Sequence, residues 1–203
     1  TEHHPRGSIA MKWTDETKET TLRDIEWSVG KTGVITPVAI FDPIRLGAGS
    51  TVTRASMHNL SVMESIPSEE EDTPSTLQIG SKIQVGLANM IIPQVYTQTP
   101  GQAEAMHPIH VPETCPVCGE KTLQKNRNGV KVLYCPNAGC PARTRGMLVN
   151  AFSRSGLNIK GLGPSQIEDL QQTGLLELYP AEAYTLKKRT NGTLPAALAA
   201  KDG

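Results

Sequence analysis

The four cysteines of this chain lie close together in the sequence as two pairs. Cys115 and Cys118 are separated by two residues, and Cys135 and Cys140 by four. Four thiolates grouped in this way can close a tetrahedron around Zn²⁺. Two disulfides are the alternative, but disulfides are rare in cytosolic proteins and we find no signal peptide ahead of the cysteines. Because four cysteine ligands leave no position open for a substrate, we predict a structural zinc rather than a catalytic one.

Positive charge is concentrated around and after the cysteines. The formal net charge of the chain is zero, yet residues 115–163 contain eight Lys or Arg residues and one acidic residue, Glu120. A basic zinc module is typical of proteins that bind a polyanion, most often nucleic acid. A solvated basic face without a partner is the alternative, because charge alone does not identify the partner. No apolar run approaches the length of a membrane span, so we expect no association with a membrane.

The residues before the cysteines must supply most of the fold, and their pattern is that of short strands. Apolar and polar residues alternate in runs that end at Gly-containing turns. Strands of this length and spacing predict a small closed or partly open β-barrel. Pro37 has no N–H to donate to a neighbouring strand, so its strand is expected at a sheet edge or at a bulge. The predicted strands are residues 8–13, 22–29, 34–41, 51–55, 79–86 and 90–96.

The connections between these strands differ in character. Residues 14–20 are expected to form a charged turn or loop, residues 30–33 a tight turn and residues 58–66 a short helix. Residues 67–76 are acidic and rich in Ser and Pro, which predicts a surface loop. After the cysteines the apolar period becomes helical in two stretches. The predicted fold class is therefore mainly β with a small α part.

A glycine turn joins the two helical stretches. Residues 159–163 follow the pattern hydrophobic, polar, Gly, hydrophobic, Gly, which is typical of the hairpin in a helix-hairpin-helix element. Its glycines let backbone N–H groups approach a phosphate, and the next helix presents its N-terminus to the anion. Such contacts position a protein on DNA without reading its sequence. An ordinary Gly-rich turn between two helices is the alternative.

Polar residues on the barrel and in the zinc module are further candidates for phosphate contact. Lys31 and Thr32 lie on a turn flanked by glycines, and Arg54 lies on a predicted strand. A solvated cation is the alternative for each, because Lys and Arg are mostly surface residues. The sequence shows no Ser/His/Asp set, P-loop or paired carboxylates, so it predicts no complete active site. The predicted DNA-binding residues are Lys31, Thr32, Arg54, Arg143, Arg145, Gly161 and Gly163.

Several of these stretches together resemble the NAD-dependent bacterial DNA ligases. Residues 29–39 read V-G-K-T-G-V-I-T-P-V-A, similar to the family's V-G-R-T-G-x-I-T-P-V-A. Residues 52–59 (V-T-R-A-S-M-H-N) are similar to V-S-R-A-T-L-H-N, and residues 91–95 (I-I-P-Q-V) to V-I-P-Q-V. The four cysteines and the glycine turn follow in the order that the family has. The resemblance covers about residues 3–178.

The resemblance implies a modular plan of adenylation domain, OB-fold, four-cysteine zinc finger and helix-hairpin-helix. Residues 4–13 resemble the last nucleotidyltransferase motif, in which Lys12 would be a catalytic residue that contacts the adenylate phosphate. The K-x-D-G motif with the nucleophilic lysine is absent from this sequence, so we expect the chain to be inactive alone. The implied boundaries are residues 1–20 for the end of the adenylation domain, 21–100 for the OB-fold, 101–113 for a linker, 114–145 for the zinc finger and 146–203 for the start of the helix-hairpin-helix region.

The function that the resemblance implies is that of the DNA-clamping portion of an enzyme that seals nicks in duplex DNA during replication and repair. Structural zinc would be the cofactor of this chain, and NAD and Mg²⁺ would be needed only by the full-length enzyme. The partners would be nicked duplex DNA and the missing adenylation domain of the same protein. We expect a monomer in the bacterial cytoplasm.

Four features depart from the family pattern, the first being Gly7, which stands where the family has Trp. Lys31 stands where the family usually has Arg, and residues 65–76 look like an acidic insertion. Residues 86–90 read G-L-A-N-M where the family has R-R-A-G-D, so Leu87 and Met90 replace charged residues. The loss of the charged residues at Leu87 and Met90 favours a second hypothesis, a non-catalytic DNA-binding protein derived from such a ligase. A third hypothesis is a zinc ribbon used for protein contacts, with the acidic segment as its docking surface.

Overall fold

The structure is a computed structural model of the whole chain, and it describes residues 16–47, 49–69, 77–102, 105–177 and 179–185. Lys12 and the strand predicted at residues 8–13 lie outside the described residues. The chain divides into two compact units. Unit 1 consists of Thr1–Glu26 and Pro37–His110, and unit 2 of Trp27–Thr36 and Val111–Gly203. Unit 2 is therefore discontinuous in sequence, because it takes a short segment from the N-terminal part of the chain.

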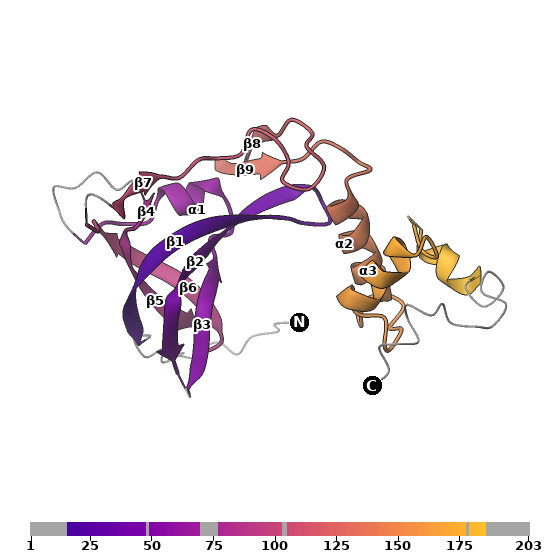
Figure 1. Cartoon of the computed structure of the whole chain (residues 1–203), viewed down its shortest axis with the longest axis horizontal. Coiled ribbons are helices and arrows are strands. Elements are labelled where there is room, and N and C mark those ends of the chain that lie inside the picture. Colours follow the sequence, from indigo (N-terminus) through magenta and orange to yellow (C-terminus); the bar gives the residue numbers. More distant parts are fainter. Residues whose placement is uncertain (1–15, 48, 70–76, 103–104, 178, 186–203) are drawn as a thin grey trace, which may run out of the picture. The chain divides into compact units, whose positions relative to one another are not determined.

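Unit 1 contains a partly closed antiparallel β-barrel (Figure 1). Hydrogen-bonded neighbours follow the order β6-β5-β1-β2, and β3 pairs with β2. Cα atoms of β3 and β6 also lie within 8 Å of one another, which brings the two ends of the sheet together. The elements are β1 (Thr17–Val29), β2 (Val34–Leu46), β3 (Ser50–Ser56), α1 (Leu60–Glu64), β4 (Gln78–Ile79), β5 (Lys82–Ala88), β6 (Ile92–Thr99) and β7 (His107–Pro108).

The core of unit 1 follows from the alternation along its strands. Leu22 of β1, Phe41 of β2 and Ile83 of β5 are buried, and their neighbours in sequence are more exposed. Helix α1 lies within the predicted residues 58–66 and buries Leu60 on its inner side. Its start is fixed by Asn59, whose Oδ1 accepts a hydrogen bond from the Val62 backbone N–H at 2.9 Å.

One strand prediction in this unit was wrong, and another was right only in part. Strand β1 begins at Thr17, so residues 17–20 are strand rather than loop; they pair with residues 83–86 of β5. Strand β2 is not an edge strand, because it lies between β1 on one side and β9 and then β3 on the other. Pro37 lies between the residues of β2 that pair with β9 and those that pair with β3. It therefore belongs to neither of these two ladders, and its missing N–H breaks no hydrogen bond in them. The register of β2 does shift between Ile40 and Ile44, so the strand is irregular, as the alternative to an edge strand expected, although the shift does not lie at Pro37 itself.

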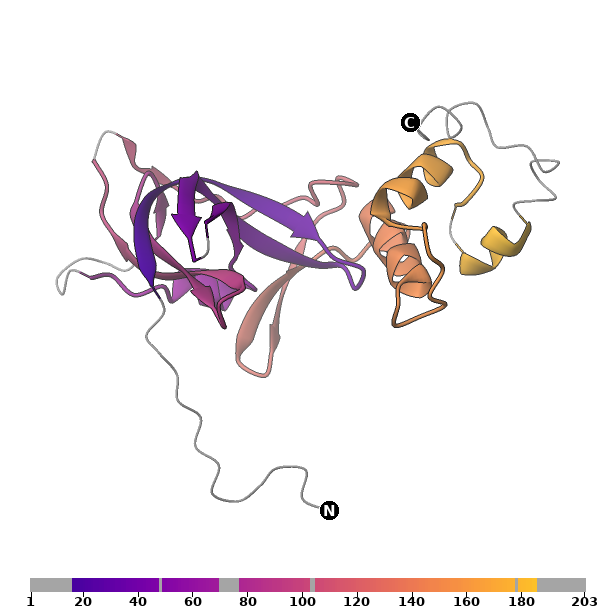
Figure 2. The same ribbon diagram turned by 90° about the horizontal axis from the view of Figure 1, so that it is seen from below.

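Unit 2 contains a two-stranded ribbon and a pair of helices. Its elements are β8 (Leu123–Arg127), β9 (Val130–Tyr134), α2 (Pro141–Phe152), α3 (Pro164–Gln172) and a 3-10 helix (Pro180–Thr185). Figure 2 shows α2 and α3 side by side, joined by the residues of the predicted glycine turn. They enclose a small core of Leu148, Phe152, Ile167, Leu170 and Leu176. Helix α2 begins at Pro141, within the residues predicted to belong to the zinc module, because proline is favoured at the first helical position.

The tip of the β1–β2 hairpin completes unit 2. Gly33 N–H donates to the Gly30 carbonyl at 2.9 Å, which forms the predicted tight turn at residues 30–33. Val34 and Ile35 pair with Tyr134 and Leu133 of β9. The structure is thus mainly β with a small α part, as predicted. None of the helices in the described residues is long and apolar enough to cross a lipid bilayer.

Candidate zinc centre and its basic surroundings

The four cysteine sulfurs meet at one point in unit 2. Their Sγ atoms all lie within 4.8 Å of one another. The Sγ atoms of Cys115 and Cys140 are 3.9 Å apart, and those of Cys118 and Cys135 are 3.6 Å apart. A tetrahedral Zn²⁺ with Zn–S bonds of about 2.3 Å places neighbouring sulfurs about 3.8 Å apart. All four cysteines are free thiols, so the disulfide alternative is wrong and the donor set fits structural zinc.

A tight backbone turn positions the first cysteine pair. Gly119 N–H donates to the Cys115 carbonyl at 2.9 Å, and Cys115 N–H donates to the Glu120 carbonyl at 2.7 Å. Gly119 has a φ of +73°, which a residue with a side chain rarely adopts, so the glycine after the first pair is required by the turn. The backbone amide of Glu120 also lowers the pKa of the Cys118 thiol to about 7. This turn therefore favours the thiolate that a metal needs.

The second pair is held between strand β9 and helix α2. Cys135 follows β9 directly, and Cys140 is the N-cap residue of α2. Burial raises the pKa of Cys135 to about 12 and also raises the pKa of Cys140. The backbone amides of Arg143 and Ala142, in the first turn of α2, act in the opposite direction on Cys140. Metal binding must therefore release protons from this buried pair.

Gly33 joins the hairpin tip to the zinc centre. The Gly33 carbonyl accepts a hydrogen bond from the Cys135 N–H at 2.8 Å. Gly33 is buried and has a φ of +86°. A Cβ atom at this position would lie 2.7 Å from the Cys135 carbonyl oxygen and 2.8 Å from the Tyr134 ring. Only glycine fits here, because both the conformation and the space exclude a side chain.

Lys31, at the tip of the same hairpin, lies against helix α2. Its Nζ donates a hydrogen bond to Asn150 Oδ1. Gly146 of α2 makes the approach possible, because a Cβ atom there would lie 3.0 Å from both Cα and Cβ of Lys31. The side chains of Lys31 and Thr32 are exposed. Lys31 and Thr32 lie on one turn, as predicted, and Lys31 packs against helix α2.

Arg143 and Arg145 of α2 have different surroundings, although both were predicted to contact DNA. Arg143 is half-buried, and its Nη1 donates to the Asn137 carbonyl at 3.0 Å. Its guanidinium carbon lies 5.7 Å from the centre of the Tyr134 ring. Arg145 Nη1 forms an ion pair with Glu168 of α3 at 3.0 Å. Both side chains therefore connect parts of unit 2, and their contact with DNA stays a prediction.

Of the remaining predicted DNA-binding residues, Arg54 and Gly161 are exposed and Gly163 is half-buried. Arg54 of β3 forms an ion pair with Glu26 of β1 at 2.6 Å. Gly161 is exposed, has a φ of +84°, and a Cβ atom there would meet nothing within 4 Å. Gly163 is the N-cap residue of α3, followed by Pro164 at the first position of the helix. The turn between α2 and α3 thus leaves open space beside Gly161, whereas a Cβ atom at Gly163 would lie 3.1 Å from Gln166 Oε1.

Sequence reasoning missed an exposed apolar turn between β5 and β6. Met90 is 82% exposed, Ile91 79% and Ile92 52%. Asn89 and Met90 both have positive φ, with values of 52° and 63°. The Ile91 N–H closes the turn on the Ala88 carbonyl at 3.2 Å. The sequence contained a sign of this feature, since three consecutive apolar residues follow a turn residue, but it was interpreted as the start of a strand.

Comparison with known proteins identifies both parts of the structure. The model of the NAD-dependent DNA ligase OB-fold domain matches residues 19–106, and that of the NAD-dependent DNA ligase C4 zinc finger domain matches residues 114–142. A DNA ligase of Lachnoclostridium phytofermentans is 44% identical over 177 residues, which are 87% of this chain and 25% of that protein. A DNA ligase of Ruminiclostridium cellulolyticum is 44% identical over 94% of this chain and 27% of its own length. The chain therefore spans about a quarter of the length of these relatives.

Proposed function

Because the chain carries the OB-fold and C4 zinc-finger domains of NAD-dependent DNA ligases, we propose that it is the DNA-clamping portion of such a ligase, which seals nicks in duplex DNA during replication and repair. The observation that carries the proposal is the succession of a barrel, a four-cysteine zinc centre and a glycine turn before a helix, in one chain. Zinc has a structural role in it, because four thiolate ligands leave no open position.

Two turns are the proposed phosphate contacts. At the hairpin tip, Lys31 and Thr32 present a cation and a hydroxyl group on a turn that α2 holds in place. Between α2 and α3, Gly161 leaves the backbone accessible two residues before Gly163, the N-cap of α3, and a helix N-terminus favours an anion. We propose that the second turn is the hairpin of a helix-hairpin-helix element. Contacts of both kinds are independent of base sequence.

The apolar β5–β6 turn is a proposed third contact. It joins the last two long strands of the barrel, and the corresponding loop is among those with which OB-folds bind nucleic acids. Apolar side chains such as Ile91 and Ile92 are of the kind that proteins insert into the minor groove of DNA. The replacement of charged residues at Leu87 and Met90 makes this turn more apolar than the family pattern, without removing its exposure.

Catalysis is proposed to need the adenylation domain, which precedes the OB-fold in the family plan. In the complete enzyme, NAD supplies AMP to activate the 5′-phosphate of the nick, and Mg²⁺ neutralises phosphate charge. This sequence has no K-x-D-G lysine to act as the nucleophile. Lys12 remains the proposed adenylate contact. We therefore propose that the chain alone is not labelled with AMP. Incubation with NAD and Mg²⁺ followed by mass spectrometry tests this; a covalent AMP adduct would contradict it.

DNA binding is the direct test of the proposed function. Fluorescence anisotropy with a labelled nicked duplex should show binding without sequence preference, and the affinity should fall linearly with salt on a double logarithmic plot. Lys31→Ala should reduce the slope by about 1, as expected for one lost phosphate contact. Asn150→Ala is the matched control, since it removes the hydrogen-bond partner of Lys31 but keeps the charge. An affinity that does not change with salt would refute the proposal.

The non-catalytic DNA-binding protein remains the second candidate, and the substitutions at Leu87 and Met90 are the observation that favours it. The two candidates differ in the complete protein, which either does or does not acquire AMP from NAD. We also propose that the protein is a monomer in the bacterial cytoplasm. Light scattering on this chain should then give a mass near 21.9 kDa.

A further inference from the structure

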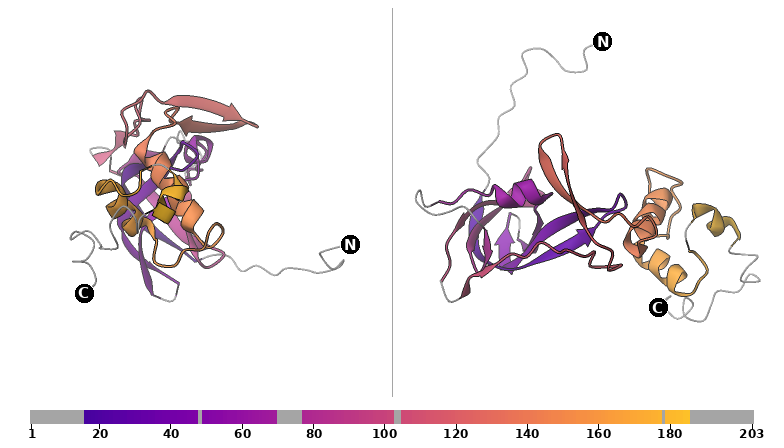
Figure 3. Two further views of the ribbon diagram at one scale, coloured as in Figure 1. Left: turned by 90° about the vertical axis from the view of Figure 1, so that its right-hand side faces the viewer. Right: turned by 90° about the horizontal axis from the view of Figure 1, so that it is seen from above.

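The β8–β9 ribbon of unit 2 carries an excess of positive charge that the contacts proposed above do not use. Residues 121–134 contain four Lys or Arg residues and no Asp or Glu. Figures 2 and 3 show β8 and β9 running side by side to a tight turn, as a ribbon that leads away from the helices of unit 2. Every residue of β8 is exposed. The four cations are Lys121, Lys125, Arg127 and Lys131.

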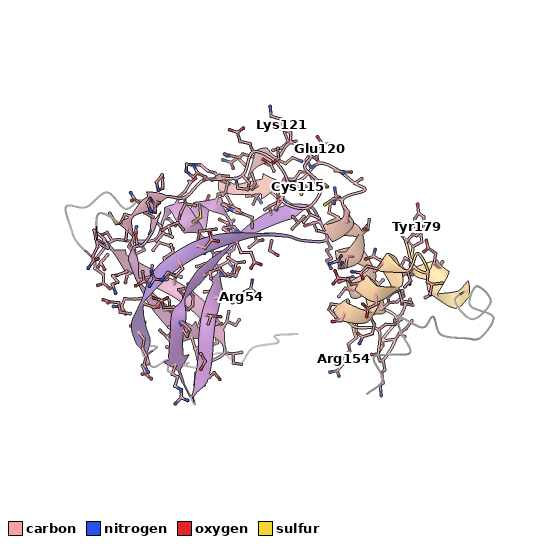
Figure 4. All side chains as sticks on the ribbon, in the orientation of Figure 1. Arg54, Cys115, Glu120, Lys121, Arg154 and Tyr179 are labelled. Carbon is pink, nitrogen blue, oxygen red and sulfur yellow. The ribbon has the colours of Figure 1, made fainter. Side chains whose placement is uncertain are left out.

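The register of the ribbon distributes these cations over both of its faces. Lys125 and Arg127 lie opposite Val132 and Val130, so these two cations share one face with each other. Lys131 lies opposite Asn126 and belongs to the other face. Lys121 stands at the base of the ribbon, where its side chain points away from the chain (Figure 4). A polyanion that approaches from either side therefore meets positive charge.

Three of these cations differ from the cations of the barrel in their surroundings. Lys18, Arg23 and Lys82 of unit 1 each have a carboxylate oxygen within 4 Å, at distances of 3.6, 2.6 and 3.5 Å. In the part of the chain that the structure describes, Lys121, Lys125 and Arg127 form no ion pair. Lys125 instead lies over the ring of Tyr134, with its Nζ 3.9 Å from the ring centre. Their charge is therefore free to act on an external anion.

The ribbon has a well-defined turn at its tip, and its base is packed next to the zinc centre. Its turn is formed by Asn128 and Gly129, with φ values of 53° and 81°, which is the favoured two-residue connection of a hairpin. Gly129 N–H donates to Asn126 Oδ1 at 2.9 Å. At its base, Leu133 is 1% exposed and the next but one residue is the zinc ligand Cys135. A strand pair that is ordered before it binds loses less conformational entropy on contact with a partner.

We propose that the β8–β9 ribbon is itself a binding surface for the phosphate backbone of duplex DNA, in addition to the hairpin tip and the glycine turn. The proposal rests on the proposed function, because it identifies the partner as the DNA that the chain clamps. Charge complementarity carries it: Lys125 and Arg127 on the exposed strand β8, and Lys121 at its base, form no ion pair, and neither strand of the ribbon carries a carboxylate. A two-stranded ribbon also has the width that the major groove admits, although phosphate contact alone is required here. The zinc centre then has two roles, since it stabilises the fold of unit 2 and positions the ribbon that contacts DNA.

The test compares two triple variants of equal charge. Lys121→Gln/Lys125→Gln/Arg127→Gln removes the ribbon cations, and Lys18→Gln/Arg23→Gln/Lys82→Gln removes three cations that carboxylates already compensate. Affinity for a nicked duplex is measured by anisotropy between 50 and 200 mM salt. Zinc content confirms that unit 2 of each variant is folded, and circular dichroism confirms the barrel of unit 1. Three lost phosphate contacts lower the salt slope by about 2.7, so the ribbon variant should lose about 40-fold less affinity over this range than wild type. The control variant should keep the wild-type slope.

The outcomes separate this inference from the proposed function. If wild type binds DNA and both triple variants have its slope, the ribbon makes no contact and the inference is wrong. If the two variants lose slope equally, net charge rather than the ribbon is responsible, which also overturns it. If wild type does not bind DNA at all, the proposed function is wrong, and the inference that rests on it is wrong as well. A third variant, Lys125→Arg/Arg127→Lys, keeps the charge and should keep the slope, because phosphate contact depends on charge more than on side-chain shape.

Discussion

Replacement of Gly33 by alanine should weaken the zinc centre, although Gly33 is not a ligand. The new Cβ atom would lie 2.7 Å from the carbonyl oxygen of Cys135 and 2.8 Å from the Tyr134 ring, at a backbone φ of +86°. The left-handed conformation costs an alanine about 1 to 2 kcal/mol. Overpacking of this kind costs about 1 to 3 kcal/mol, and the hydrogen bond from Cys135 N–H to the Gly33 carbonyl is worth about 1 kcal/mol if it breaks.

Gly129→Ala provides a matched control for the conformational part of this cost. Gly129 has nearly the same φ, +81°, and lies in another hairpin turn of unit 2, but a Cβ atom there would meet nothing within 4 Å. The two variants share the cost of a left-handed alanine, and only Gly33→Ala adds the collision with the zinc ligand. We therefore expect Gly33→Ala to be less stable than Gly129→Ala by about 2 to 3 kcal/mol.

Zinc affinity is the appropriate measurement, because metal binding and local folding share one free energy in such modules. Competition with a chromophoric chelator should show Gly33→Ala binding zinc about 30- to 150-fold more weakly than Gly129→Ala, as follows from 1.4 kcal/mol per factor of ten. Gly129→Ala should bind zinc only about 5- to 30-fold more weakly than wild type, which is the cost of a left-handed alanine alone. Equal zinc affinities in the two variants would refute the claim that the hairpin tip and the zinc centre are one packed structure.

Three further predictions follow from other parts of the structure. Cys115→Ser should lose zinc and unfold the zinc module locally, which metal analysis and circular dichroism would detect; retention of one zinc per chain would contradict it. Ile91→Ala should weaken binding to a nicked duplex without changing the salt slope, because an apolar side chain releases no counterions; a reduced slope would contradict it. Arg23 donates to Asp42 at 2.8 and 2.6 Å, and this hydrogen bonding lowers the pKa of the carboxyl group below its usual value. A lowered pKa contributes stability that is present at neutral pH and is lost as the pH falls through the folded-state pKa. Asp42→Asn should therefore be less stable than wild type at pH 7, and the difference should shrink below about pH 4 in urea titrations. A difference that grows on acidification would contradict this.

The zinc centre could be predicted from the sequence because its chemistry is local. The spacing of Cys115, Cys118, Cys135 and Cys140 restricts which groups can meet, and the glycine after the first pair marks its turn. Most strands were predicted for the same reason, since alternation over a few residues is visible without knowledge of the partner strand.

The errors arose where the partner decides the structure. Residues 17–20 are mainly polar and look like a loop, but β5 pairs with them and Glu19 forms an ion pair with Lys82 at 3.5 Å. Pro37 marks an edge strand in most sheets, yet here it falls where β2 exchanges one neighbour for another. Nothing in the spacing indicated that Arg143 would contact Tyr134, or that Gly146 would receive Lys31, because these contacts join distant parts of the chain.

The discontinuity of unit 2 has a consequence for how this protein can be divided. A truncation that ends in the segment predicted as a linker, residues 101–113, would look like a clean separation of two domains in the sequence. It would in fact leave Val34 and Ile35 without the strand that pairs with them, and such an uncovered edge invites pairing with other chains. During synthesis, Lys31 at the tip of the β1–β2 hairpin cannot contact Asn150 until that residue, 119 positions later in the chain, has been made. A soluble barrel fragment is therefore better obtained by shortening the β1–β2 hairpin than by cutting the linker alone.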